Sequence, residues 1–249
     1  MSEAVPGIKS AFDKEDDGDV VVTDQRSPRP KDAATLILVR RDAATPRVLL
    51  GKRSGGHTFM PDKYVFPGGR VDPHDARAPT LTPLSEPVAT KLAIGTRRAP
   101  HAFALTAIRE TFEETGLIVG RPGEHSGKAP QGWDRYYGEG VMPCLRSFEF
   151  IGRAITPPYR PKRFDARFFM ADAEDALIDE RPPVDGAELS DLQWVTLADA
   201  LIGWEDTHRR AQLDVSNIAD TRDLSTCLAQ SDGFVDTRRT ILGSLTYEF

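Results

Sequence analysis

The most informative segment of the chain reads Arg109-Glu110-Thr111-Phe112-Glu113-Glu114-Thr115-Gly116-Leu117. It forms the second half of a helix predicted over residues 100–115. Pro100 suits the first turn of a helix, because the N–H that it lacks would have no partner there. Gly116 suits the left-handed residue that ends many helices, since glycine adopts a positive φ without steric cost. The last two turns of this helix therefore carry three glutamates.

The side chains of this helix fall into two groups, with the carboxylates Glu110, Glu113 and Glu114 within an arc of about 100° and the apolar Leu105, Ile108 and Phe112 on the opposite side. Carboxylates near the negative end of a helix cost about 0.3–1 kcal/mol each. Like charges at i,i+3 and i,i+4 cost roughly 0.2–0.5 kcal/mol per pair. A hard dication such as Mg²⁺ or Mn²⁺ would offset these costs. The helix alone leaves a metal site and a solvated acidic face equally open.

A second motif lies upstream, where Phe66-Pro67-Gly68-Gly69 predicts a tight turn and Asp75 follows after five intervening residues. Together the two segments resemble the Nudix box, whose pattern is G, five residues, E, seven residues, R-E-U-x-E-E-x-G-U, with U a bulky aliphatic residue. The chain is therefore similar to the Nudix hydrolases over about residues 32–202. This resemblance implies an α+β fold of the Nudix type, an α/β/α sandwich with a mixed β-sheet between helices.

The resemblance also implies roles for single residues of the box. The metal ligands for Mg²⁺ or Mn²⁺ would be Glu110, Glu113, Glu114 and the carbonyl oxygen of Gly69. Arg109 would orient these carboxylates through a salt bridge to Asp75. Gly68 in the turn and Gly116 after the helix would be structural residues of the motif.

Three features depart from the family pattern. Position 75 is Asp, which is one methylene shorter than Glu, and position 111 is Thr rather than an aliphatic residue. Residues 76–108 separate Asp75 from Arg109 where the pattern has only seven residues, so an insertion of about 76–100 must loop out. Such a loop costs little, because loop-closure entropy grows only logarithmically with length. An insertion here is similar to the Nudix subgroup that includes acyl-coenzyme A diphosphatases, which makes coenzyme A and acyl-coenzyme A candidate substrates.

The implied reaction is attack of water on one phosphorus of a diphosphate, assisted by metal and by a general base. Glu113, Glu110 and Glu188 are candidates for the base, and the sequence does not choose among them. Arg53 and Arg163 are candidates for binding phosphate, since a guanidinium donates two parallel hydrogen bonds. Each also has a plainer interpretation, as an exposed arginine at the end of a strand, and Glu188 could be a surface capping residue.

The remainder of the chain predicts three regions. Residues 1–31 are polar and rich in acidic side chains, which predicts a flexible arm. Residues 32–204 form the predicted Nudix domain, with strands at 34–40, 47–50, 148–151, 168–170 and 192–195 and a short helix from 86 to about 92. Residues 205–249 are predicted to form a C-terminal helical extension.

Composition restricts the partners. With 32 Lys and Arg against 38 Asp and Glu, the net charge of −6 argues against a nucleic-acid polymer. The sequence predicts neither a membrane span nor a secretory signal, and its two distant cysteines fit a reducing compartment, so a cytoplasmic protein is expected. The expected partner is a small-molecule diphosphate, and a homodimer is left open.

Two other functions compete with catalysis. A non-catalytic Nudix-fold ligand sensor would normally have lost one or more of the box carboxylates, and all three are present here. A metal-stabilised scaffold would leave the Phe66–Gly69 turn without a role. The sequence therefore favours a hydrolase.

Overall fold

The structure is a computed structural model that describes residues 28–54, 64–156, 158 and 162–196, together with the backbone of strands Arg209–Ser216 and Thr240–Tyr247. These residues belong to two compact units, and the larger one comprises residues 28–158 and 162–196. The larger unit contains all of the predicted box.

The strands of the larger unit are β1 (Lys31–Arg40), β2 (Arg47–Arg53), β3 (Tyr64–Val65), β4 (Gly68–Arg70), β5 (Arg121–Pro122), β6 (Val141–Met142), β7 (Glu149–Ile155), β8 (Phe164–Asp172) and β9 (Leu189–Thr196). Its helices are the 3₁₀ turn η1 (Asp75–Arg77), α1 (Glu86–Ala93), α2 (Pro100–Thr115), α3 (Asp134–Gly138) and α4 (Ala173–Ala176). The strands predicted from the sequence are confirmed, and each is longer than predicted, although β7 begins at Glu149 rather than at residue 148.

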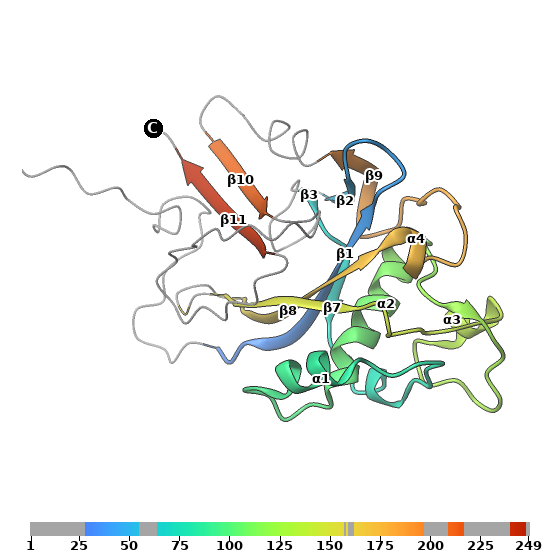
Figure 1. Cartoon of the computed structure of the whole chain (residues 1–249). Coiled ribbons are helices and arrows are strands. Elements are labelled where there is room, and N and C mark those ends of the chain that lie inside the picture. The colour runs from blue at the N-terminus through green and yellow to red at the C-terminus, as the bar shows by residue number, and fades with distance from the viewer. Residues whose placement is uncertain are drawn as a thin grey trace, which may run out of the picture. The chain divides into compact units, whose positions relative to one another are not determined.

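The main sheet is mixed and has the order β3-β2-β1-β8-β7, with β4 paired to β1 and β9 paired to β2 (Figure 1). Strands β1 and β8 run parallel from Lys31↔Phe164 to Val39↔Asp172, and the other pairs are antiparallel. The middle of β1 is buried without a break from Leu36 to Val39, as expected for a strand covered on both faces. β1 is thus the centre of the fold, and β4 holds the glycine turn against it.

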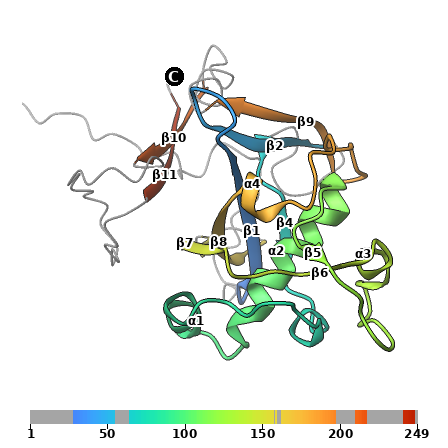
Figure 2. The same cartoon turned by 45° about the vertical axis from the view of Figure 1, so that its right-hand side comes forward.

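Helix α2 runs from Pro100 to Thr115, the bounds that the sequence predicts, and it ends at Gly116 with φ of 70°. It packs against β1 and β4 (Figure 2). The first half of α2 is buried all round, from Ala102 to Ile108, because α1 and the insertion cover the side that would otherwise face solvent. The glutamates of α2 lie only in its second half. The first half of the helix therefore belongs to the hydrophobic core, and the second half carries the carboxylates of the box.

The insertion after Asp75 is built into the fold. Its backbone bonds to the segment that follows α3, through Leu81 N–H to the Pro143 carbonyl at 2.8 Å. The Tyr137 hydroxyl donates to the Pro79 carbonyl at 2.9 Å. Near its end, Arg98 forms an ion pair with Asp32 on β1 at 2.6 Å. These contacts hold the insertion against the rest of the larger unit.

The smaller unit includes an antiparallel pair, β10 (Arg209–Ser216) and β11 (Thr240–Tyr247), in register from Arg209↔Tyr247 to Ser216↔Thr240. The prediction of a helical extension over 205–249 is therefore wrong for these two segments. The pattern of 209–216 alternates polar and apolar residues, which is the period of a strand. Most of the predicted N-terminal arm, residues 1–27, lies outside the described residues. Among the helices that are described, none is both long enough and apolar enough to span a membrane.

Candidate active site

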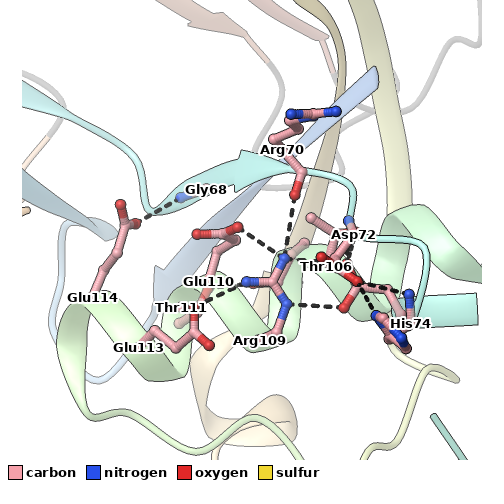
Figure 3. A network of polar contacts seen from close by, with 12 residues as sticks. Gly68, Arg70, Asp72, His74, Thr106, Arg109, Glu110, Thr111, Glu113 and Glu114 are labelled. Carbon is pink, nitrogen blue, oxygen red and sulfur yellow. Dashed lines mark hydrogen bonds and ion pairs between the residues drawn. The ribbon is translucent and has the colours of Figure 1, made fainter. Parts of the chain in front are cut away.

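The two halves of the box meet where β4 crosses the second half of α2. Gly68 and Gly69 pair with Thr35 and Ala34 of β1. The Gly68 N–H donates to the Glu114 carboxylate at 2.9 Å (Figure 3). A Cβ on Gly68 would come within 2.5 Å of the Ala34 carbonyl oxygen on β1, and a Cβ on Gly69 would come within 2.4 Å of the Glu110 carboxyl carbon on α2. Close contact with the strand therefore accounts for glycine at position 68, and close contact with the helix accounts for glycine at position 69.

Arg109 is the centre of the polar network in Figure 3. Its guanidinium forms a bidentate salt bridge with Asp75, with Nε–Oδ1 at 2.8 Å and Nη2–Oδ2 at 3.1 Å. The same guanidinium forms ion pairs with Glu110 at 2.9 Å and with Glu113 at 2.9 Å, and it donates to the Arg70 carbonyl at 3.2 Å. The predicted salt bridge between positions 75 and 109 is present, although the carboxylate is an aspartate.

Asp75 is completely buried and is held by more than Arg109. Its Oδ2 accepts from the Thr106 hydroxyl at 2.7 Å and from the Asp72 N–H at 2.9 Å. Its Oδ1 accepts from the Trp133 indole N–H at 3.0 Å. Neither Trp133 nor Thr106 is part of the box motif, and Trp133 lies 58 residues from Asp75. Sequence spacing carries no signal for this contact.

Burial disfavours the charged form of two carboxylates of the box, Glu110 and Glu114. Burial raises the pKa of Glu110 to about 7, with Arg109 opposing the rise and Glu113 and Glu188 adding to it. Burial likewise raises the pKa of Glu114 to about 8, although the Gly68 N–H opposes it. Buried anions without sufficient positive charge mark a place where a cation would be stabilised.

The donors at this place fit a hard divalent cation. Carboxylate and carbonyl oxygens are the ligands that Mg²⁺ and Mn²⁺ prefer, and the Glu110 carboxylate lies directly against Gly69. Among the residues that the structure describes, no three acidic, histidine or cysteine side chains converge closely enough to hold a metal as they stand. Glu113 is held by Arg109 and Glu114 by the Gly68 N–H, so a full carboxylate shell requires at least one of them to rotate.

The connection after α4 brings Glu188 to the site. Its backbone caps the end of α2, with Val184 N–H donating to the Thr115 carbonyl at 2.8 Å. A Cβ on Gly186 would come within 2.9 Å of the Glu114 carbonyl oxygen. Glu188 interacts electrostatically with both Glu110 and Glu114. The predicted candidate base therefore lies near the box, although 74 positions separate it from Glu114.

The two predicted phosphate-binding arginines have different surroundings. Arg53 ends β2 and interacts electrostatically with Glu114 and Glu188, while its burial lowers the pKa of its guanidinium. Arg163 instead donates to the Thr156 carbonyl at 3.0 Å and to the Pro28 carbonyl at 2.9 Å. Arg53 therefore lies near the carboxylates of Glu114 and Glu188, whereas these contacts of Arg163 hold the start of β8.

Comparison with known proteins agrees with this fold. A crystal structure of a Nudix hydrolase from Alicyclobacillus acidocaldarius is 30% identical, covers 70% of this chain and 82% of its own, and superposes with a TM-score of 0.54. Nudix hydrolase 7 of Caenorhabditis elegans is 27% identical over 66% of this chain and 51% of its own length. An acyl-coenzyme A diphosphatase of Gallus gallus is 28% identical over 62% of this chain and 55% of its own. No family model matches the chain.

This chain belongs to the Nudix hydrolase family. The α+β fold with a mixed sheet and the resemblance to the family, including its acyl-coenzyme A diphosphatases, are thereby confirmed. The chain spans about half the length of these curated relatives.

Proposed function

We propose that this chain is a divalent-metal-dependent diphosphatase that cleaves the diphosphate linkage of a nucleoside-diphosphate-X substrate. The observation that carries the proposal is the meeting of the box halves, with Glu110 against Gly69 and Glu114 bonded to the Gly68 N–H. Glu110, Glu113, Glu114 and the Gly69 carbonyl would hold Mg²⁺ or Mn²⁺. A bound divalent ion would neutralise the non-bridging phosphate oxygens and lower the pKa of a coordinated water.

The protein's own residues supply the rest of the reaction. Arg109 keeps Glu110 and Glu113 in place through its ion pairs. Arg53 would donate to a phosphate oxygen, because its guanidinium is half-buried beside the carboxylates. Glu188 would accept the proton of the attacking water as general base, with Glu113 and Glu110 as alternatives. The new P–O bond forms to water, the bridging P–O bond breaks, and a phosphomonoester leaves.

Coenzyme A and acyl-coenzyme A are the proposed substrates. One curated relative carries an acyl-coenzyme A diphosphatase name, and the insertion between Asp75 and Arg109 is of the kind that its subgroup shows. Both molecules contain a diphosphate between a nucleoside and a second group, which is the linkage that the proposed chemistry requires.

A phosphate-release screen tests the proposal directly. The purified chain is assayed with Mg²⁺ and with Mn²⁺, using a coupled phosphatase, on coenzyme A, acyl-coenzyme A, NADH, ADP-ribose, nucleotide sugars, dinucleoside polyphosphates and nucleoside triphosphates. Turnover of coenzyme A species above the others supports both the reaction and the substrate. Preference for another diphosphate supports the reaction and discards the substrate. No turnover with either metal would favour a ligand sensor instead.

A matched pair of variants assigns the turnover to the box. Glu114→Gln keeps an oxygen that accepts from the Gly68 N–H but removes the negative charge, so the fold should persist while turnover is lost. Glu124→Gln changes an exposed glutamate away from the box and should behave as the wild type. Full activity in Glu114→Gln would contradict the metal site.

A further inference from the structure

Trp133 is a buried tryptophan whose indole N–H donates a hydrogen bond to Asp75. It is fully buried in the segment that precedes α3, and its Nε1 lies 3.0 Å from Asp75 Oδ1. The ring is held by edge-to-face contacts with Tyr136, at 5.2 Å between centroids, and by Tyr137 at 5.7 Å. A buried indole N–H needs a partner, and here the partner is a carboxylate of the box.

Trp133 is connected to the proposed metal ligands through two residues, Asp75 and Arg109. Asp75 accepts from Trp133 and forms the bidentate salt bridge to Arg109. Arg109 in turn forms ion pairs with Glu110 and with Glu113. Gly132, next to Trp133, also lies against Arg109, since a Cβ there would be 3.6 Å from the arginine Cδ. The orientation of two proposed metal ligands therefore depends on a carboxylate that Trp133 helps to hold.

The indole also accounts for the aspartate at position 75. With Trp133, Thr106, the Asp72 N–H and Arg109 around it, Asp75 has no exposed surface. A glutamate, the residue of the family pattern, would bring an additional methylene into this closed space, and overpacking of a filled interior is destabilising. The Asp75 side chain and the Trp133 indole therefore fill the same part of the interior.

From this geometry we propose that Trp133 is a positioning residue of the active site, which sets the metal-binding arrangement of Glu110 and Glu113 through Asp75 and Arg109. Its indole N–H holds Asp75 Oδ1, the oxygen that also accepts from Arg109 Nε. Residues 75 and 133 consequently form a coupled pair, and the inference rests on the proposed function of the box.

The first test measures Mn²⁺ binding by electron paramagnetic resonance, without substrate. Trp133→Phe removes the N–H and keeps an aromatic ring in the cluster. Loss of a direct hydrogen-bond partner of a ligand weakens metal sites by roughly 10–100-fold. Because Trp133 acts through Asp75 and Arg109, the dissociation constant for Mn²⁺ should rise by about tenfold, the low end of that range. The Mg²⁺ concentration for half-maximal turnover should rise in parallel, with KM for the diphosphate little changed.

Tyr136→Phe is the matched control. Tyr136 is fully buried in the same aromatic cluster and donates to the Val119 carbonyl at 2.7 Å, away from Asp75. It should reduce the free energy of unfolding and leave Mn²⁺ affinity unchanged. If Trp133→Phe binds Mn²⁺ as the wild type does, or if both variants weaken Mn²⁺ equally, Trp133 has only a packing role and the inference is wrong.

A second pair of variants tests the coupling without relying on Trp133→Phe alone. Asp75→Glu should weaken Mn²⁺ binding, and adding Trp133→Phe should restore part of it by making room for the methylene. Additive losses in the double variant would overturn the coupling. A wild type that binds Mn²⁺ but turns over no diphosphate would refute the proposed function and leave this binding test intact. A wild type that does not bind Mn²⁺ would refute both.

Discussion

Gly69 lies directly against the carboxylate of Glu110. A Cβ atom on Gly69 would come within 2.4 Å of the Glu110 carboxyl carbon and within 2.6 Å of both carboxylate oxygens. The obstructing atoms are the end of a side chain rather than backbone, so the fold can adjust by moving that carboxylate. A substitution at Gly69 can therefore change metal binding without unfolding the protein.

Gly69→Ala is predicted to fold and to lose metal affinity. The new methyl group displaces Glu110 from its place between the turn and Arg109, which should weaken Mn²⁺ binding and lower kcat by roughly tenfold or more. Gly152→Ala is the control, because a Cβ on Gly152 of β7 meets nothing within 4 Å. Titration with Mn²⁺ and thermal unfolding of both variants make the comparison. Wild-type metal affinity in Gly69→Ala would contradict the placement of Glu110.

The metal-free protein is predicted to lose stability as pH rises from about 5 to about 8. Burial raises the pKa of Glu110 to about 7 and of Glu114 to about 8, against an ordinary value of 4.5. The folded state therefore keeps protons that the unfolded chain has already released in this interval. Because the folded state binds more protons, its free energy of unfolding must decrease as pH increases.

Thermal unfolding in EDTA across this pH range measures that slope. Glu114→Gln should flatten it, since one of the two titrating groups is gone. Added Mg²⁺ should raise the unfolding temperature most at the alkaline end, where the carboxylates are charged and compete least with protons. Stability that increases from about pH 5 to about pH 8 in EDTA would show that these carboxylates are not protonated in the folded state.

Arg53→Ala is predicted to weaken substrate binding without weakening metal binding. A hydrogen bond to a charged group contributes about 1.5–3 kcal/mol, which corresponds to roughly 10–100-fold in kcat/KM. Removing a cation that interacts with Glu114 and Glu188 leaves the site more negative, so Mn²⁺ should bind as well or better. Arg47→Ala, at the other end of β2 and paired with Asp42 at 2.6 Å, serves as the control. An unchanged kcat/KM in Arg53→Ala would exclude the phosphate contact.

The box could be predicted from the sequence because its chemistry is local. Helix α2 begins at Pro100 and ends before Gly116 as predicted, since both signals act on the backbone of adjacent residues. The salt bridge from Asp75 to Arg109 followed from the motif. Its surroundings did not, because Trp133 reaches Asp75 only through the packing of the segment after the box.

Long-range pairing decides what the local sequence does not indicate. Arg163 stays a prediction as a phosphate-binding residue, and the parallel pairing of β1 with β8 places it where its guanidinium donates to the Thr156 and Pro28 carbonyls. That pairing joins segments more than 120 residues apart, and the sequence near Arg163 does not indicate it. The helical extension predicted over 205–249 is wrong for β10 and β11, which pair with each other, and in β10 the alternation of polar and apolar residues is the local signal of a strand.

Glu188→Gln is predicted to lower kcat while leaving KM and Mn²⁺ affinity nearly unchanged. A general base contributes roughly 10²–10⁴-fold, and Glu188 lies near enough to raise the pKa of both Glu110 and Glu114. Glu188→Gln removes the repulsion between Glu188 and the carboxylates of Glu110 and Glu114. The metal-free variant should therefore be no less stable than the wild type. The exposed Glu180 on the same connection provides the control variant Glu180→Gln. Should Glu188→Gln retain wild-type kcat, Glu188 is not the general base, and Glu113 and Glu110 on α2 remain the candidates.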